Sequence, residues 1–155
     1  MPRPPAILFV CLGNICRSPM AEGALRARAD AAGLDLTIDS AGTGGWHVGE
    51  PPDERAQAEA LAHGVDISDL RGRQVSPEDF TRFTHIFALD EENLANLRRI
   101  APQTHDAHVG LLLDTVPNLA GQPVADPYYG GAEGFTRTWD QVDAAAQALV
   151  RRFTA

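Results

Sequence analysis

The sequence contains no lysine: its 13 basic residues are all arginines, and they stand against 21 Asp and Glu residues for a formal net charge of −8. Without lysine the chain can form no Schiff base and no Walker A loop, whose lysine contacts phosphates. The acidic excess disfavours general binding to nucleic acid or to an anionic membrane, because both need an exposed basic surface. We therefore expect neither partner.

Cysteines and long apolar runs are also scarce. Cys11 and Cys16 are the only cysteines, too few and too close together for the disulfide framework of a small secreted domain. The first apolar run, residues 6–12, is too short to cross a membrane and lacks a signal-cleavage pattern. His105 and His108 could bind a metal ion only with further ligands, and no second cluster is evident. We expect a cytoplasmic protein with reduced thiols and no metal or other cofactor.

The 155 residues and the apolar fraction of 44% suit a single domain spanning residues 1–155. Hydrophobic patterns predict alternating strands and helices. Strands are expected at residues 7–10, 36–39, 85–89 and 109–113, and helices at 20–32, 53–63, 91–100 and 135–153, with a short helix opened by residues 76–79. This alternation predicts right-handed crossovers and a four-stranded parallel sheet with helices on both faces, that is, an α/β fold.

Several local signals refine these elements. Ser18 and Ser76, each followed by proline, are expected to cap helices, and Gly33 and Gly64 to end them. Residues 41–52 are predicted to be a Gly-rich loop long enough to serve a function, and the Pro- and Gly-rich residues 115–134 carry no periodicity.

The loop between the first strand and the first helix reads Cys11-Leu12-Gly13-Asn14-Ile15-Cys16-Arg17-Ser18-Pro19. Backbone N–H groups at a helix N-terminus, together with Arg17, would bind a tetrahedral oxyanion such as phosphate and favour a thiolate on Cys11. Gly13 and Asn14 tolerate the left-handed backbone of a tight loop, and the Ser18 hydroxyl could face the sulfur. The plainer alternative is that both cysteines only fill buried space.

This loop and the segment Asp126-Pro127-Tyr128-Tyr129 resemble the low-molecular-weight protein tyrosine phosphatase family, and the similarity runs over essentially the whole chain. Residues 40–43, 46–49 and 73–75 also resemble family positions. The resemblance implies a four-stranded, flavodoxin-like fold of the phosphotyrosine phosphatase I type, in agreement with the pattern above. It further implies an enzyme that acts on phosphotyrosyl proteins or small aryl phosphates, without metal and, we assume, as a monomer.

The resemblance also implies roles for particular residues. Cys11 would attack phosphorus, Arg17 and the loop amides would hold the phosphate oxygens, and Asp126 would protonate the departing phenolate and later activate water. The phosphate-binding loop would comprise Leu12, Gly13, Asn14, Ile15, Cys16 and Ser18. Considered without the Cys11 loop, Asp126 is equally consistent with an ordinary solvated carboxylate in a turn.

Three aromatic residues in loops, Trp46, Tyr128 and Tyr129, are expected to form walls around an aryl group, although ordinary partial burial would also explain them. Related enzymes that act on phosphoarginine resemble this loop but carry Thr at the position of Ile15 and lack the paired tyrosines. The sequence therefore favours phosphotyrosine, with protein-arginine phosphatase activity as an alternative.

Two further alternatives and one departure remain. An arsenate reductase of this fold would need two cysteines outside the loop, which the chain lacks, and a phosphopeptide-binding module would need neither Cys11 nor Asp126. Cys16 is interpreted either as a reversible disulfide partner of Cys11 under peroxide or as a packing residue. Leu70 stands where the family often has a histidine in a polar network behind the loop, so we expect altered loop rigidity or stability.

Overall fold

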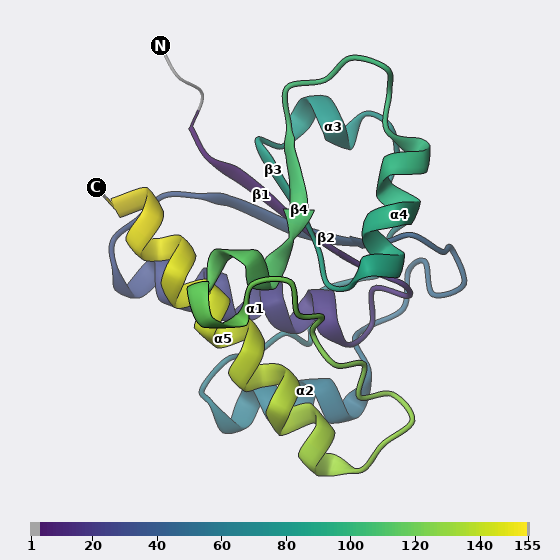
Figure 1. The fold of residues 1–155 in the computed structure, drawn as a ribbon. Coiled ribbons are helices and arrows are strands. Elements are labelled where there is room, and N and C mark those ends of the chain that lie inside the picture. Colours follow the sequence, from purple (N-terminus) through teal and green to yellow (C-terminus); the bar gives the residue numbers. More distant parts are fainter. Residues whose placement is uncertain (1–3, 155) are drawn as a thin grey trace.

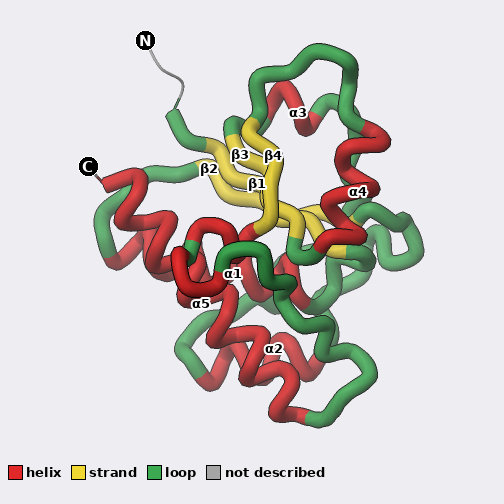
Figure 2. The backbone as a smooth tube through the Cα atoms, viewed as in Figure 1, coloured by secondary structure: helices red, strands yellow, loops and turns green. Residues whose placement is uncertain are grey.

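The computed structural model describes residues 4–154, which form one four-stranded parallel sheet in the order β2-β1-β3-β4. The strands are β1 (Ala6–Cys11), β2 (Thr37–Gly42), β3 (His85–Ala88) and β4 (His108–Leu111). Helices lie on both sides of the sheet, as Figures 1 and 2 show. The fold class predicted from the sequence is thus confirmed.

The helices divide between the two faces of the sheet. On one face lie α1 (Arg17–Ala31), α2 (Glu54–Ala62) and α5 (Ala132–Thr154), and on the other α3 (Asp79–Arg82) and α4 (Glu91–Ile100) (Figure 1). Two short 3₁₀ helices, η1 (Leu112–Thr115) and η2 (Pro117–Leu119), follow β4. Among residues 4–154, no helix combines the length and hydropathy that a bilayer span requires.

Strand β1 is fully buried because it has a helical layer on each face. Ile7, Phe9 and Cys11 pack with α1 and α5, whereas Leu8 and Val10 pack with α3 and α4. The side chains of a strand point alternately to its two faces, so a strand with apolar residues at every position must be covered on both sides. The continuous apolar run in the sequence predicted this. Cys11 is the last residue of β1 and lies at the carboxyl edge of the sheet.

Two strand ends differ from the prediction by more than one residue. Strand β2 continues to Gly42 rather than ending at residue 39, since Ser40, Ala41 and Gly42 pair with the last three residues of β1. The strand predicted at residues 109–113 ends at Leu111, and the chain turns into η1. Apolar runs do not distinguish a strand from a buried helical turn, and the leucines of η1 are buried against the α1–α5 side.

Both serine caps were predicted wrongly. Helix α1 begins at Arg17 with no side-chain cap, because the Ser18 hydroxyl lies against the Cys11 sulfur instead. Helix α3 begins three residues after Ser76, whose backbone N–H donates to the Asp79 carboxylate. The predicted glycine stops hold: Gly33 and Gly64 follow their helices with φ of 66° and 79°.

Candidate active site

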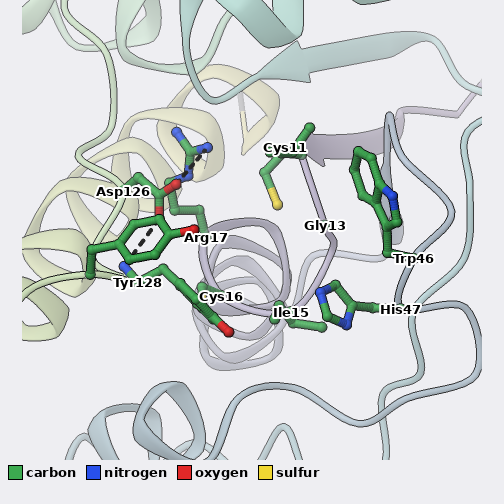
Figure 3. Close-up of a pocket in the computed structure, with 11 residues that line it drawn as sticks. Cys11, Gly13, Ile15, Cys16, Arg17, Trp46, His47, Asp126 and Tyr128 are labelled. Carbon is green, nitrogen blue, oxygen red and sulfur yellow. Dashed lines mark hydrogen bonds and ion pairs between the residues drawn. The ribbon is translucent and has the colours of Figure 1, made fainter.

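A pocket of about 200 Å³ lies at the carboxyl edge of the sheet, beyond the end of β1. Its lining includes most of the residues singled out from the sequence: Cys11, Leu12, Gly13, Ile15, Cys16, Arg17, Trp46, Asp126, Tyr128 and Tyr129, with His47 in addition. Segments more than 100 residues apart in the chain therefore meet around one sulfur atom (Figure 3). Asn14 and Ser18 do not line the pocket but lie buried behind the loop.

The Cys11 sulfur is surrounded by hydrogen-bonding groups. Its Sγ lies 3.0 Å from the Ser18 hydroxyl and accepts a hydrogen bond from the Asn14 backbone N–H at 3.3 Å. Asn14 has a φ of 59°, the left-handed backbone anticipated for this loop. The turn directs the Asn14 N–H group at the sulfur.

A polar network fixes the back of this loop. The Asn14 side-chain amide donates to the hydroxyls of Ser18 and Ser40, at 2.8 and 3.0 Å, and its carbonyl accepts from the Arg73 N–H at 3.0 Å. The Ser40 hydroxyl in turn donates to the buried Glu22 carboxylate at 2.7 Å.

Leu70 takes no part in this network: it is partly buried and packs against the core. The hydrogen bonds joining Asn14 and Ser40 therefore form without a histidine at that position.

Arg26 forms an ion pair with Glu22 at 2.7 Å and partly balances its charge. Burial nevertheless raises the pKa of Glu22, against the lowering effects of the Ser40 hydrogen bond and Arg26.

Arg17 is 3% exposed and is held from behind. Its Nη1 donates to the Asp90 carboxylate at 2.7 Å and to the Val124 carbonyl at 3.1 Å, while Nη2 lies 3.8 Å from the Asp126 carboxylate. Burial alone would lower the pKa of Arg17, but the Cys11 sulfur and Asp90 outweigh it and raise the pKa. The guanidinium is thus a fixed cation at the pocket floor.

Asp126 lies in the loop before α5, at the pocket rim beside Arg17 (Figure 3). Its carboxylate accepts the Tyr128 backbone N–H at 3.1 Å and its side chain is about half exposed. A carboxyl group in this place can exchange protons both with a ligand in the pocket and with water.

Aromatic side chains flank the opening. Trp46 and Tyr128 lie on opposite sides of the pocket (Figure 3), and Tyr129 packs edge-on against Tyr128. Trp46 is 70% and Tyr129 94% exposed, so these rings project beyond the core rather than filling it. The sulfur lies below this rim, because Cys11 itself is buried.

Cys16 lies in the same pocket, and neither it nor Cys11 is in a disulfide. Burial raises the pKa of the Cys16 thiol above its ordinary value, and Asp53 raises it further. Cys16 is therefore a neutral thiol in the loop that carries Cys11.

Sequence reasoning missed Asp90 and gave His47 no role. Asp90 follows strand β3, the neighbour of β1, and in parallel sheets ligand sites gather where neighbouring strands end and the strand order reverses. That rule, applied to β3, could have found Asp90. The His47 Nδ1 atom lies 3.1 Å from the Glu50 carboxylate, and the ring packs so close to Gly13 that a Cβ atom there would lie 3.0 Å from His47 Cδ2.

The sequence model of one family, described as low molecular weight phosphotyrosine protein phosphatase, matches residues 6–155. The chain belongs to this family. A phosphatase of the same name from Schizosaccharomyces pombe is 47% identical over 148 residues, which cover 94% of each chain. Relatives carry protein tyrosine phosphatase names, and this phosphatase is an enzyme of that class.

Solved structures agree with the fold. The crystal structure of a protein tyrosine phosphatase from Entamoeba histolytica superimposes with a TM-score of 0.90 at 35% identity, covering 96% of both chains. A drosophila arginine phosphatase also superimposes with a TM-score of 0.90, at 32% identity, covering 96% of this phosphatase and 98% of its own chain.

Proposed function

We propose that this phosphatase hydrolyses phosphotyrosine and related aryl phosphates in two steps, through a cysteinyl-phosphate on Cys11. The observation that carries the proposal is the meeting of three groups in one pocket: a sulfur with hydrogen-bond donors, a buried arginine and a half-exposed carboxyl group. A nucleophile, a phosphate-binding cation and a proton donor are what such a displacement requires.

In the first step the phosphoryl group would enter the loop with its oxygens on Arg17 and on the backbone N–H groups at the start of α1, which no side chain caps. The Cys11 thiolate attacks phosphorus, a sulfur–phosphorus bond forms and the bond to the phenolic oxygen breaks. Asp126 donates its proton to that oxygen, so the product leaves as a neutral phenol.

In the second step Asp126, now a carboxylate, accepts a proton from water as the water oxygen attacks phosphorus. The sulfur–phosphorus bond breaks, inorganic phosphate is released and Cys11 leaves as a thiolate. The Ser18 hydroxyl, 3.0 Å from the sulfur, stabilises the leaving thiolate.

The recessed sulfur and the aromatic rim favour aryl esters. A phenyl ring between Trp46 and Tyr128 would carry the phosphate towards the buried sulfur, whereas the shorter side chain of phosphoserine would bring the peptide backbone nearer the rim. We infer that phosphotyrosyl proteins and small aryl phosphates are the substrates.

Phosphoarginine is a second candidate, because one solved structural relative is named an arginine phosphatase. Ile15 argues against it: the side chain lines the pocket, and an apolar group there offers no hydrogen-bond acceptor to a guanidinium.

Phosphate release from phosphotyrosine, phosphoarginine and phosphoserine peptides, measured without added metal, tests the proposal. We expect turnover of phosphotyrosine that vanishes in Cys11→Ser and falls about 10²- to 10⁴-fold in Asp126→Ala. A preference for phosphoarginine would overturn the argument from Ile15. Phosphotyrosine binding without turnover would favour a binding module, and turnover of no phosphate compound would reopen arsenate reduction.

We also propose Cys16 as the redox partner of Cys11. Peroxide would oxidise the Cys11 thiolate to a sulfenic acid, releasing hydroxide, and the Cys16 thiol would then displace water to form a disulfide. After peroxide treatment followed by dithiothreitol, wild type is expected to recover more activity than Cys16→Ser. Equal recovery would leave Cys16 as a packing residue.

A further inference from the structure

Arg55, in the first turn of α2, touches the segment that carries the proposed acid. Its guanidinium carbon lies 5.4 Å from the ring centre of Tyr128 and 4.8 Å from that of Phe135. Tyr128 is two residues from Asp126, and Phe135 is buried in α5. A guanidinium is attracted to aromatic faces at these distances, so Arg55 holds Tyr128 close to the start of α5.

The other side of Arg55 is tied to the phosphate-binding loop through Asp53. The Asp53 carboxylate accepts from the Arg55 backbone N–H at 2.8 Å, from Nε at 3.1 Å and from Nη2 at 3.0 Å. The Asp53 backbone N–H donates to the Ile15 carbonyl at 2.8 Å. The Arg55 hydrogen bonds and charge lower the pKa of Asp53 and keep the pair ionised.

A continuous set of contacts thus joins the loop of the nucleophile to the loop of the acid. It runs from Ile15 to Asp53, from Asp53 to Arg55, and from Arg55 to Tyr128, whose backbone N–H holds the Asp126 carboxylate at 3.1 Å. Asp126 itself is about half exposed and lies 3.8 Å from Arg17, a long ion pair. Its position therefore depends on how Tyr128 is held.

We infer that Arg55 is a positioning residue: it fixes the acid-bearing loop over the phosphate-binding loop and so sets where Asp126 transfers its proton. The inference rests on the proposed role of Asp126. Arg55 does not line the pocket, so it acts through Tyr128 and not on the substrate.

The chain offers a matched control in Arg28. Its guanidinium also binds one carboxylate through two hydrogen bonds, to Asp143 at 2.8 and 2.7 Å, and it is 44% exposed against 45% for Arg55. This pair joins α1 to α5 and lines no part of the pocket. Arg28→Met therefore measures how much activity is lost when a half-exposed arginine–aspartate pair is removed away from the pocket.

The test compares kcat/KM for two small substrates that differ in leaving group. The phenolate of p-nitrophenyl phosphate departs with little protonation, whereas that of phenyl phosphate needs the acid. We expect Arg55→Met to lower kcat/KM for phenyl phosphate about 10-fold and for p-nitrophenyl phosphate less than about 2-fold. Arg55→Lys, which keeps the charge but not the planar fork, is expected to fall between. Arg28→Met should match wild type on both substrates.

Two further measurements separate positioning from damage. The inhibition constant of inorganic phosphate should be unchanged in Arg55→Met, because Arg17 and the loop amides are untouched. The effect of Arg55→Met should also disappear when Tyr128 is replaced by leucine, since Arg55 then has no ring to hold there.

An equal loss on both substrates, or no loss on either, would overturn the positioning role. Asp126→Asn distinguishes this failure from failure of the proposed function. If Asp126→Asn shows the leaving-group dependence and Arg55→Met does not, only the positioning role is wrong. If Asp126→Asn lacks it as well, Asp126 is not the acid and both proposals fall.

Discussion

At the scale of single residues, Arg17, the proposed phosphate-binding residue, is held by the carboxylate of Asp90, which lies between β3 and α4. The Asp90 carboxylate accepts from Arg17 at 2.7 Å and, through its other oxygen, caps α4 by accepting from the Asn93 N–H. A cation that must present its donors to phosphate loses less side-chain entropy on binding when such a partner already fixes it.

Asp90→Asn separates the two roles, because asparagine caps helices as well as aspartate but carries no charge. We expect kcat/KM for p-nitrophenyl phosphate to fall about 10- to 100-fold, the equivalent of one lost charge-assisted hydrogen bond, and the inhibition constant of phosphate to rise. Asp143→Asn, which uncouples the exposed Arg28, is the control. Unchanged phosphate inhibition in Asp90→Asn would show that Arg17 needs no such support.

Glu22 makes stability depend on pH. Burial raises its pKa above the ordinary value of 4.5, so the folded protein holds this proton more tightly than the unfolded chain. Stability from this group is fully present below the unfolded pKa and is lost as pH rises through the folded pKa. The stability of wild type relative to Glu22→Gln, measured by thermal unfolding, should therefore fall between pH 4 and pH 7. An advantage that grows with pH would contradict the shift.

The sequence predicts those site residues that lie close together along the chain and misses some that the fold brings in from distant segments. Cys11, Arg17 and Ser18 lie in one short segment between a predicted strand and a predicted helix, and their spacing together with this placement predicted an anion site. Asp90 and Glu22 are brought to the site by the sheet and by α1, and nothing near them in the sequence suggests phosphate chemistry.

At the scale of elements, the end of β2 lies against the loop that follows Cys11. Gly42 pairs with Cys11, and a Cβ atom on Gly42 would lie 2.8 Å from the Leu12 carbonyl oxygen and 3.2 Å from the Asn14 nitrogen. The loop can approach β2 this closely only because residue 42 has no side chain.

Gly42→Ala is expected to push the loop away from β2 and lower kcat/KM roughly 10- to 100-fold, since small displacements of catalytic groups are costly. Gly110→Ala is the matched control, because it lies in the edge strand β4 and its added Cβ would meet only His108, at 3.5 Å. Steady-state kinetics of both variants, with thermal unfolding to verify folding, provide the measurement. Equal activities would mean that the loop does not depend on this contact.

Two of the errors at element ends involve residues that contact or support the loop of Cys11. The Ser18 hydroxyl was predicted to cap a helix, but it contacts the Cys11 sulfur and leaves the first N–H groups of α1 without a side-chain partner. The contact with the sulfur overrode the local capping preference at the place where the proposed function needs free donors. Ser40 lies in the part of β2 beyond the predicted strand end, and its buried hydroxyl belongs to the polar network behind the loop.

At the scale of the whole molecule, the sheet and its two helical layers were predictable because short apolar runs alternate along the chain with longer helical segments. Strand β1 needed cover on both faces, and the apolar stripe of residues 135–153 predicted the long helix α5. The meeting of Trp46, Asp126 and Cys11 was predicted only through the family resemblance, because long loops have no periodicity to place them.

The fold places the Cys11 sulfur at the end of strand β1 and brings the Asp126 carboxyl group to the same pocket on a distant loop. The central claim is that phosphate passes through Cys11. Asp126→Asn, mixed with p-nitrophenyl phosphate and quenched rapidly, should accumulate the intermediate, because the leaving group needs little acid and the second step lacks its base. Peptide mass spectrometry should then find one phosphoryl group on Cys11, and none in a variant that also carries Cys11→Ser. Phosphate on another residue, or turnover with no covalent intermediate under these conditions, would contradict the account.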